Sequence, residues 1–139
     1  MTRLHLGLDA SLVAAFVEVL GRCGVQRGDA CTVLAETHSR HVLVEAATLA
    51  LAQLGARCAT LLLPSRAPTS PAPVRSTGSS DVIQGLEPAV QALAASVLVV
   101  DCTVEGLQHA AELPRILHGG ARVLVVSNEH PEILMRCLP

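Results

Sequence analysis

The sequence predicts an α/β fold, a Rossmann-like three-layer sandwich with a mostly parallel sheet of about four strands. Three observations support this prediction. Apolar runs rich in β-branched residues alternate with segments whose apolar residues recur at helical spacing. Glycines stand at several of the expected junctions between these segments. Phe16 is the only aromatic residue, so the core must consist of Leu, Val, Ala and Ile, which suits a buried parallel sheet.

The first half of the chain predicts a leading N-terminal helix followed by two strands with a helix between them. Asp9 is a candidate N-cap for a helix over residues 11–23. Residues 30–36 form the first strand, and residues 56–63 form the second. Ser39 is a candidate N-cap for the helix between them, over residues 40–54.

A change of composition separates the two halves. Residues 65–80 are rich in proline and serine and predict a long loop, either a lid or a disordered segment. Helix is expected again over residues 81–95, with a kink at Pro88, and then a strand over residues 97–102. The last elements are a helix over residues 106–117, a stop at Gly119 and Gly120, a strand over residues 122–126, and a helix that begins at Pro131.

The length of 139 residues fits a single domain. The pattern stops soon after the last helix begins, so we expect residues 1–139 to be one domain of a longer protein.

The composition argues against several classes of partner. All ten basic residues are arginines scattered along a chain of net charge −2, so no basic stripe is available for nucleic acid. No apolar run is long enough to span a membrane, and the N-terminus lacks the features of a signal peptide. We therefore expect a cytoplasmic protein without nucleic-acid or membrane partners. The five cysteines form no C-x-x-C pair, and Cys31, Cys58 and Cys102 fall inside apolar runs, so we expect a structural role and not metal or redox use.

Polar residues follow the first, third and fourth predicted strands. In a doubly wound sheet the first and third strands are central neighbours, and ligands bind beyond the carboxyl ends of such strands. The candidates for a ligand site or an interdomain cleft are Glu36, His38, Asp101, Thr103, Glu105, Ser127, Asn128, Glu129 and His130. The alternative is that Asp101 and Thr103 cap the following helix while Asn128 and Glu129 shape a turn.

The candidate residues do not form a complete catalytic or metal-binding set. His38 and His41, or Glu105 and His109, have a spacing that fits one helix face, but neither pair has a third ligand nearby in sequence. Glycine-rich phosphate loops and the G-x-S-x-G motif of serine hydrolases are absent. We therefore assign no catalytic residue and no metal ligand.

Residues 97–134 carry a family resemblance. The patterns VVD-x-T-x-EGL-x-HA-x-E and ILHGGARVLVVSNEHPE, with residues 75–78 (RSTG) before them, resemble the N-terminal region of the 2,5-dihydroxypyridine 5,6-dioxygenases of bacterial nicotinate breakdown. That group is related to the thermophilic metallo-aminopeptidases, often labelled leucyl aminopeptidases. The likeness extends loosely to Gly28, Asp29 and the strand that follows.

The resemblance implies a two-domain parent enzyme. Fe(II), held by His and Asp side chains of the C-terminal domain, would support ring opening between C5 and C6 to N-formylmaleamate. Residues 1–139 would then be a non-catalytic N-terminal domain without a cofactor, inactive alone, and the missing C-terminal domain would be its partner. We also expect a homo-oligomer.

Two alternatives remain. The same resemblance allows the N-terminal domain of a metallo-aminopeptidase, whose metal-activated water would hydrolyse peptides. The other is a stand-alone ligand-binding or assembly module that uses the polar strand ends.

Overall fold

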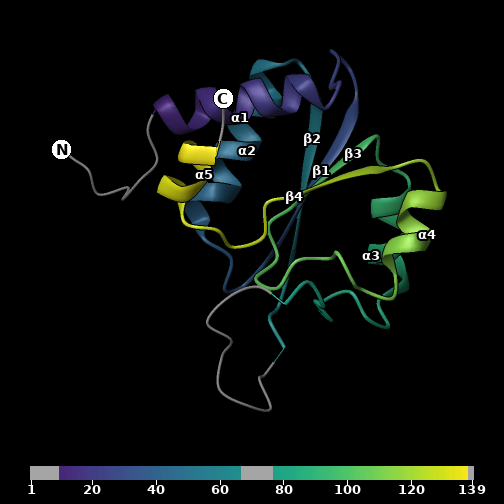
Figure 1. The fold of residues 1–139 in the computed structure, drawn as a ribbon. Coiled ribbons are helices and arrows are strands. Elements are labelled where there is room, and N and C mark those ends of the chain that lie inside the picture. The colour runs from purple at the N-terminus through teal and green to yellow at the C-terminus, as the bar shows by residue number, and fades with distance from the viewer. Residues whose placement is uncertain (1–9, 67–76, 138–139) are drawn as a thin grey trace.

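The computed structural model describes residues 10–66 and 77–137. Helices and strands alternate along the chain, as Figure 1 shows. The strands are β1 (Ala30–Glu36), β2 (Arg57–Leu63), β3 (Leu98–Asp101) and β4 (Arg122–Val125). The helices are α1 (Ala10–Arg22), α2 (His41–Gln53), α3 (Glu87–Ala94), α4 (Leu113–His118) and α5 (Pro131–Cys137).

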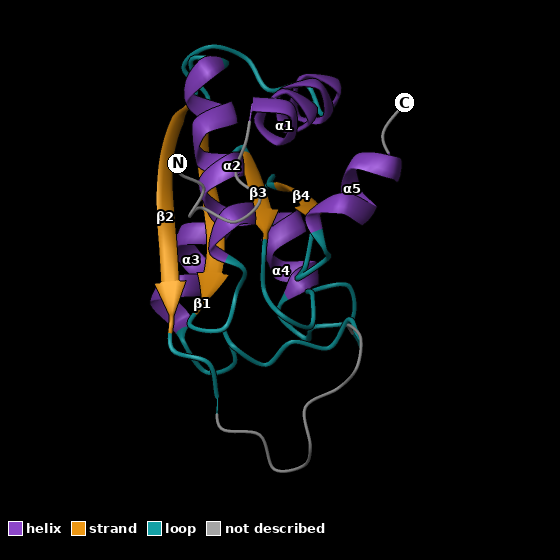
Figure 2. Cartoon of the chain, turned by 90° about the vertical axis from the view of Figure 1, so that its left-hand side faces the viewer, coloured by secondary structure: helices purple, strands orange, loops and turns teal. Residues whose placement is uncertain are grey.

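The four strands form one parallel sheet in the order β2-β1-β3-β4. The prediction that the first and third strands are central neighbours is therefore confirmed. Helices α1, α2 and α5 lie on one face of the sheet, and α3 and α4 lie on the other (Figures 1 and 2). This arrangement is the predicted three-layer sandwich, and it directs the carboxyl ends of all four strands to one edge.

Two apolar clusters hold the layers together. The cluster under α1 and α2 contains Phe16, which is 5% exposed, and the fully buried Leu20 and Leu51. The second cluster lies under α3 and α4 around Leu93 and Ile116. Each buried side chain of this size stabilises the fold by roughly 1.5–3 kcal/mol relative to exposure. The central strand β1 is buried along almost its whole length because both clusters cover it.

Most predicted elements are confirmed within one or two residues, the usual uncertainty of such boundaries. The first strand has the predicted limits, and the last helix begins at Pro131 as expected. The Asp9 cap and the middle of the predicted 65–80 loop lie outside the described residues. On either side of that gap, residues 64–66 and 77–80 are neither helix nor strand, and Arg66 pairs with Asp81 across it at 3.4 Å.

The predicted helix over residues 81–95 is wrong in its first third. Residues 82–85 form turns in which Gly85 has a φ of 76°, and the helix begins only at Glu87. Pro88 lies in the first turn, where its missing N–H costs nothing. It therefore starts α3 and does not kink it.

The predicted helix over residues 106–117 is also too long. Gly106 has a φ of 82°, and turns continue until α4 begins at Leu113, followed by Pro114 in its first turn. Side chains at the end of β3 bind the backbone N–H groups of Gly106 and Leu107. These N–H groups hold a loop together, so a helix over residues 106–112 does not form.

Candidate functional site

The polar candidates of β1, β3 and β4 meet at the carboxyl edge of the sheet, where the loop after β3 joins them. Val104 in this loop connects the ends of β1 and β4. Its N–H donates to Oε2 of Glu36 at 2.7 Å, and its carbonyl accepts the hydroxyl of Ser127 at 3.0 Å. The sequence prediction that these strand ends converge is therefore supported by direct contacts.

Glu36 closes β1 with a side chain that is almost buried. Its Oε1 accepts the hydroxyl of Ser65, just after β2, at 2.8 Å, while Oε2 holds the loop after β3. One carboxylate thus ties the ends of β1, β2 and β3 together. Both oxygens are used for structure.

Asp101 is fully buried at the end of β3 and organises the loop that follows. Its Oδ1 accepts the N–H of Thr103 at 2.9 Å and the Thr103 hydroxyl at 2.6 Å. Its Oδ2 accepts the N–H of Leu107 at 2.8 Å. Thr103 in turn accepts the N–H of Gly106 at 3.1 Å. The interpretation of these two residues as helix caps is wrong in detail, because they bind a loop and α4 begins later.

The pKa of Asp101 is raised above its ordinary value. Burial is the largest cause, and the bonds from Thr103 and Leu107, which favour the carboxylate, oppose it only in part. The nearby charge of Glu36 raises the pKa further. A buried carboxylate with a perturbed pKa is a typical sign of a functional site. Here, however, its oxygens face backbone and hydroxyl donors of the same chain.

Ser39 completes this network, although the sequence suggested another role for it. Its hydroxyl accepts the N–H of Glu36 at 2.9 Å and donates to the carbonyl of Cys102 at 2.6 Å. The N-cap of α2 is Arg40, which makes no side-chain cap bond. Ser39 therefore joins β1 to β3 and does not cap the helix.

Ser127 follows β4 in a strained conformation. It has a φ of 60° and is the one non-glycine residue with a positive φ among those described. Its N–H and that of Val126 both donate to the carbonyl of Asp101, at 2.7 and 2.9 Å. These bonds and the hydroxyl bond to Val104 hold the turn in place.

Asn128 binds Arg40, a residue that the sequence did not single out. Oδ1 of Asn128 accepts the N–H of Arg40 at 2.9 Å, and the Asn128 carbonyl accepts the Nε of Arg40 at 3.1 Å. The sequence suggests that Asn128 shapes a turn. In the structure it also bonds across the sheet edge to a residue 88 positions away in the sequence. The guanidinium is held at the surface between the ends of β1 and β4.

The remaining candidates lie at the exposed rim. His38, Glu129 and His130 are exposed, and Nδ1 of His130 accepts the N–H of Glu132 at 3.2 Å. Glu105 is half-exposed, and its carboxylate accepts the Thr77 hydroxyl. The pairs His38/His41 and Glu105/His109 do not share a helix face, because only His41 lies in a helix.

The donor set at this edge does not fit a metal ion. The four oxygens of Glu36 and Asp101 already accept hydrogen bonds from the chain. Among the described residues, no three His, Cys, Asp or Glu side chains are close enough to hold a metal. Burial raises the pKa of the Cys102 thiol to about 12, so it remains protonated.

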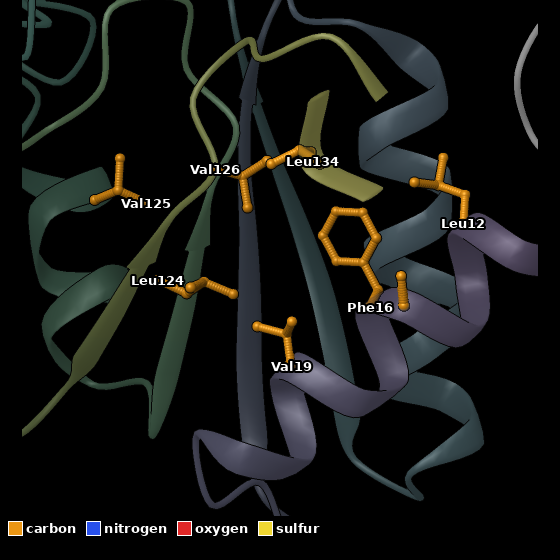
Figure 3. A pocket seen from close by; sticks show the side chains of 8 residues that line it. Leu12, Phe16, Val19, Leu124, Val125, Val126 and Leu134 are labelled. Atoms are coloured by element: carbon orange, nitrogen blue, oxygen red, sulfur yellow. The ribbon is translucent and has the colours of Figure 1, made fainter. Parts of the chain in front are cut away.

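A separate apolar pocket of about 130 Å³ lies between α1, β4 and α5. Figure 3 shows Phe16 and Val19 of α1 extending toward Leu124 of β4, with Leu134 of α5 above them. All eight lining side chains are apolar. The pocket therefore offers apolar contacts alone.

The arrangement at the strand ends is best suited to fixing loops rigidly at one edge of the sheet. It offers exposed imidazole, guanidinium and carboxylate groups at the rim, above a buried and internally satisfied network. No described helix is long and apolar enough to cross a membrane.

Comparison with known proteins agrees with the resemblance seen in the sequence. The family model described as 2,5-dihydroxypyridine 5,6-dioxygenase matches residues 11–139. The solved structure of a 2,5-dihydroxypyridine dioxygenase from Pseudomonas putida KT2440 is 33% identical, with a TM-score of 0.80 over 92% of this chain. The chain spans 37% of that enzyme's length.

A more distant likeness concerns the fold alone. The structure of NpsA from Klebsiella oxytoca, in complex with 3-hydroxyanthranilyl-AMSN, is 16% identical with a TM-score of 0.50. The match covers 94% of this chain and 20% of that one. No curated protein sequence matches this chain significantly.

Proposed function

The chain belongs to the 2,5-dihydroxypyridine 5,6-dioxygenase family, and we propose that it is the N-terminal, non-catalytic domain of an enzyme that opens the 2,5-dihydroxypyridine ring. The observation that carries the proposal is the 33% identity to the Pseudomonas putida enzyme, over 92% of this chain but 37% of the enzyme. The greater part of such an enzyme would lie outside these 139 residues.

The internal bonding of the strand ends supports a non-catalytic role. Glu36 and Asp101 have no carboxylate oxygen left without a hydrogen bond from the chain. We propose that Fe(II) is held by His and Asp side chains of the C-terminal part of the enzyme, where it supplies the reaction of the ring with O2. The residues described here do not fit an iron ligand set, so we assign no chemical step to them.

We propose that the rim of the strand ends forms one wall of the cleft between the two domains. His38, Arg40 and His130 are exposed there, and Asn128 fixes the position of Arg40. The network around Glu36 and Asp101 keeps the loops beneath them rigid. A rigid wall of this kind orients a domain interface or a substrate without taking part in bond breaking.

The test is to read the coding sequence beyond codon 139 and to assay the product of the complete reading frame. We expect it to consume 2,5-dihydroxypyridine with Fe(II) and O2, seen as loss of the substrate's ultraviolet absorbance. The 139-residue chain alone should leave the substrate unchanged. Peptide hydrolysis by the complete product would favour the metallo-aminopeptidase. A stop codon directly after Pro139 would overturn the proposal in favour of a stand-alone module.

A further inference from the structure

Two cysteines lie side by side on neighbouring strands. Cys31 of β1 pairs in register with Cys58 of β2, and the two strands run next to each other in the sheet (Figure 2). Both residues are free thiols. The sequence predicts a structural role for both, since each falls in an apolar run, and only the register of the sheet brings them together.

The two side chains lie on the same face of the sheet. Cys31 belongs to the apolar cluster under α1 and α2, and Cys58 packs against that cluster. Adjacent strands are about 4.7–4.9 Å apart, so the Cα atoms of this pair lie within the range of roughly 4.4–6.8 Å that disulfides span. The Cys58 sulfur is also within hydrogen-bonding reach of the Val33 backbone, on β1. It therefore lies next to the strand that carries Cys31.

The two thiols differ in their access to solvent. Cys58 is half-buried, whereas Cys31 is 2% exposed. Burial is the main reason that the pKa of each thiol is raised, and the charges of Asp29 and Cys58 raise the pKa of Cys31 further. The effect of Cys58 on Cys31 is a second sign that the two sulfurs are close. Because a thiol with a raised pKa reacts slowly, we expect its oxidation to need an excess of oxidant.

We propose that Cys31 and Cys58 are a modification site, at which hydrogen peroxide converts the two thiols to a disulfide between β1 and β2. The more exposed Cys58 sulfur attacks one peroxide oxygen, so that an S–O bond forms, the O–O bond breaks and one water leaves. The Cys31 sulfur then attacks the sulfur of this sulfenic acid. The S–S bond forms, the S–O bond breaks, and the hydroxide that leaves takes up the Cys31 thiol proton as a second water. The two sulfurs together lose two electrons, and one peroxide is reduced to two waters.

The disulfide ties the strands at the end of the sheet opposite the polar edge. Cys31 and Cys58 are the second residues of their strands, whereas Glu36 and Ser65 meet at the other end. In a registered parallel pair the Cβ atoms are about as far apart as the Cα atoms, which exceeds the usual Cβ separation of about 3.8 Å in a disulfide. The bond is therefore strained, and a small thiol reduces it readily.

Peptide mapping of the 139-residue chain tests the proposal. Trypsin cleaves after arginine and leaves the five cysteines in five different peptides, with Cys31 in residues 28–40 and Cys58 in residues 58–66. After treatment with hydrogen peroxide, unfolding and alkylation of the remaining thiols, we expect one main linked pair, 28–40 with 58–66. Its mass should show the loss of two hydrogen atoms, and dithiothreitol should separate it. A main link between any other two cysteines would overturn the proposal, as would recovery of Cys31 as a free thiol.

Serine variants test the order of the two steps. Cys31→Ser should lose the linked peptide and leave Cys58 as a sulfenic acid that dimedone traps. The matched control is Cys23→Ser, because Cys23 is also half-buried but lies outside the strands. This control should keep the link between Cys31 and Cys58. Loss of the link in Cys23→Ser, or a Cys31→Ser protein in which dimedone does not label Cys58, would contradict the mechanism. Neither test depends on the proposed enzymatic function.

Discussion

The carboxylate of Asp101 accepts the N–H of Leu107 at 2.8 Å, across a loop of five intervening residues. The same carboxylate binds Thr103 through both its N–H and its hydroxyl. Since Asp101 is fully buried, no solvent can replace these partners. The pair explains why a loop follows β3 where sequence periodicity predicts a helix.

Replacing Asp101 by Asn should destabilise the protein by about 1–3 kcal/mol, because the amide nitrogen cannot accept a hydrogen bond and one buried N–H loses its partner. The measurement is the free energy of unfolding in urea. The control is Asp81→Asn, since the Asp81 side chain is 61% exposed and pairs only at the surface. It should change stability by less than about 0.5 kcal/mol. Equal effects of the two variants would show that the Asp101 bonds contribute little.

The dependence of stability on pH should also reveal Asp101. Its pKa in the folded protein is raised above 3.8, chiefly by burial, so the folded state binds this proton more tightly than the unfolded state. Its contribution to stability is therefore present at low pH and is lost as the pH rises through the folded pKa. We expect the difference in unfolding free energy between wild type and Asp101→Asn to be larger near about pH 4 than near about pH 7. A difference independent of pH would contradict the raised pKa.

Glu87 provides the opposite case in the same experiment. The hydrogen bond from Arg115 is the main reason that its pKa is lowered to about 2 from 4.5. Its contribution is present above pH 4.5 and is lost as the pH falls toward 2. The effect of Glu87→Gln should therefore shrink on acidification, and it should be small throughout because the pair is exposed.

The sequence was sufficient for the layout of the fold but not for the bonding of the site. β1 and β3 were predicted because continuous apolar runs have few other solutions in a buried parallel sheet. The errors lie at Pro88 and at Gly106. The periodicity predicts a helix that includes Pro88 and another that begins at Gly106, whereas Pro88 lies in the first turn of α3 and Gly106 has a positive φ. These local signals were present in the sequence, but apolar periodicity outweighed them.

The contacts within the site had no local signal. Glu36 binds Val104 over 68 positions, and Ser39 binds Cys102 over 63 positions. The strand order brings these residues to the same edge, but the sequence does not indicate which donor each acceptor selects. The structure places several of the predicted polar residues at one edge of the sheet, while their use as a ligand site or interdomain cleft stays a prediction.

Ser127 offers a test of backbone strain against side-chain bonding. Ser127→Ala loses the bond to the Val104 carbonyl and keeps a φ of 60°, so we expect it to lose about 1–2 kcal/mol of stability. Ser127→Gly loses the same bond but relieves the left-handed backbone, so its loss should be smaller. Thermal melting of both variants gives the comparison. The reverse order would mean that the native turn does not strain this residue.

Gly119 and Gly120, which end α4, should resist substitution for two different reasons. A Cβ on Gly119 would lie 2.8 Å from the Ala94 carbonyl oxygen and 2.9 Å from its Cβ, in the contact between α3 and α4. Gly120 has open space around it but a φ of 106°. Alanine at either position should cost about 1–3 kcal/mol, through overpacking at Gly119 and through backbone strain at Gly120.

A double-mutant cycle with Ala94→Gly separates the two causes. Removing the Ala94 methyl group relieves one of the two close contacts at position 119 and none at position 120. We therefore expect Ala94→Gly to recover part of the stability lost in Gly119→Ala and none of that lost in Gly120→Ala, measured as unfolding free energies in urea. Equal coupling at both positions would mean that the helix end moves as a unit. Coupling at Gly119 alone would show that the helix end is fixed by its packing on α3 as well as by the turn.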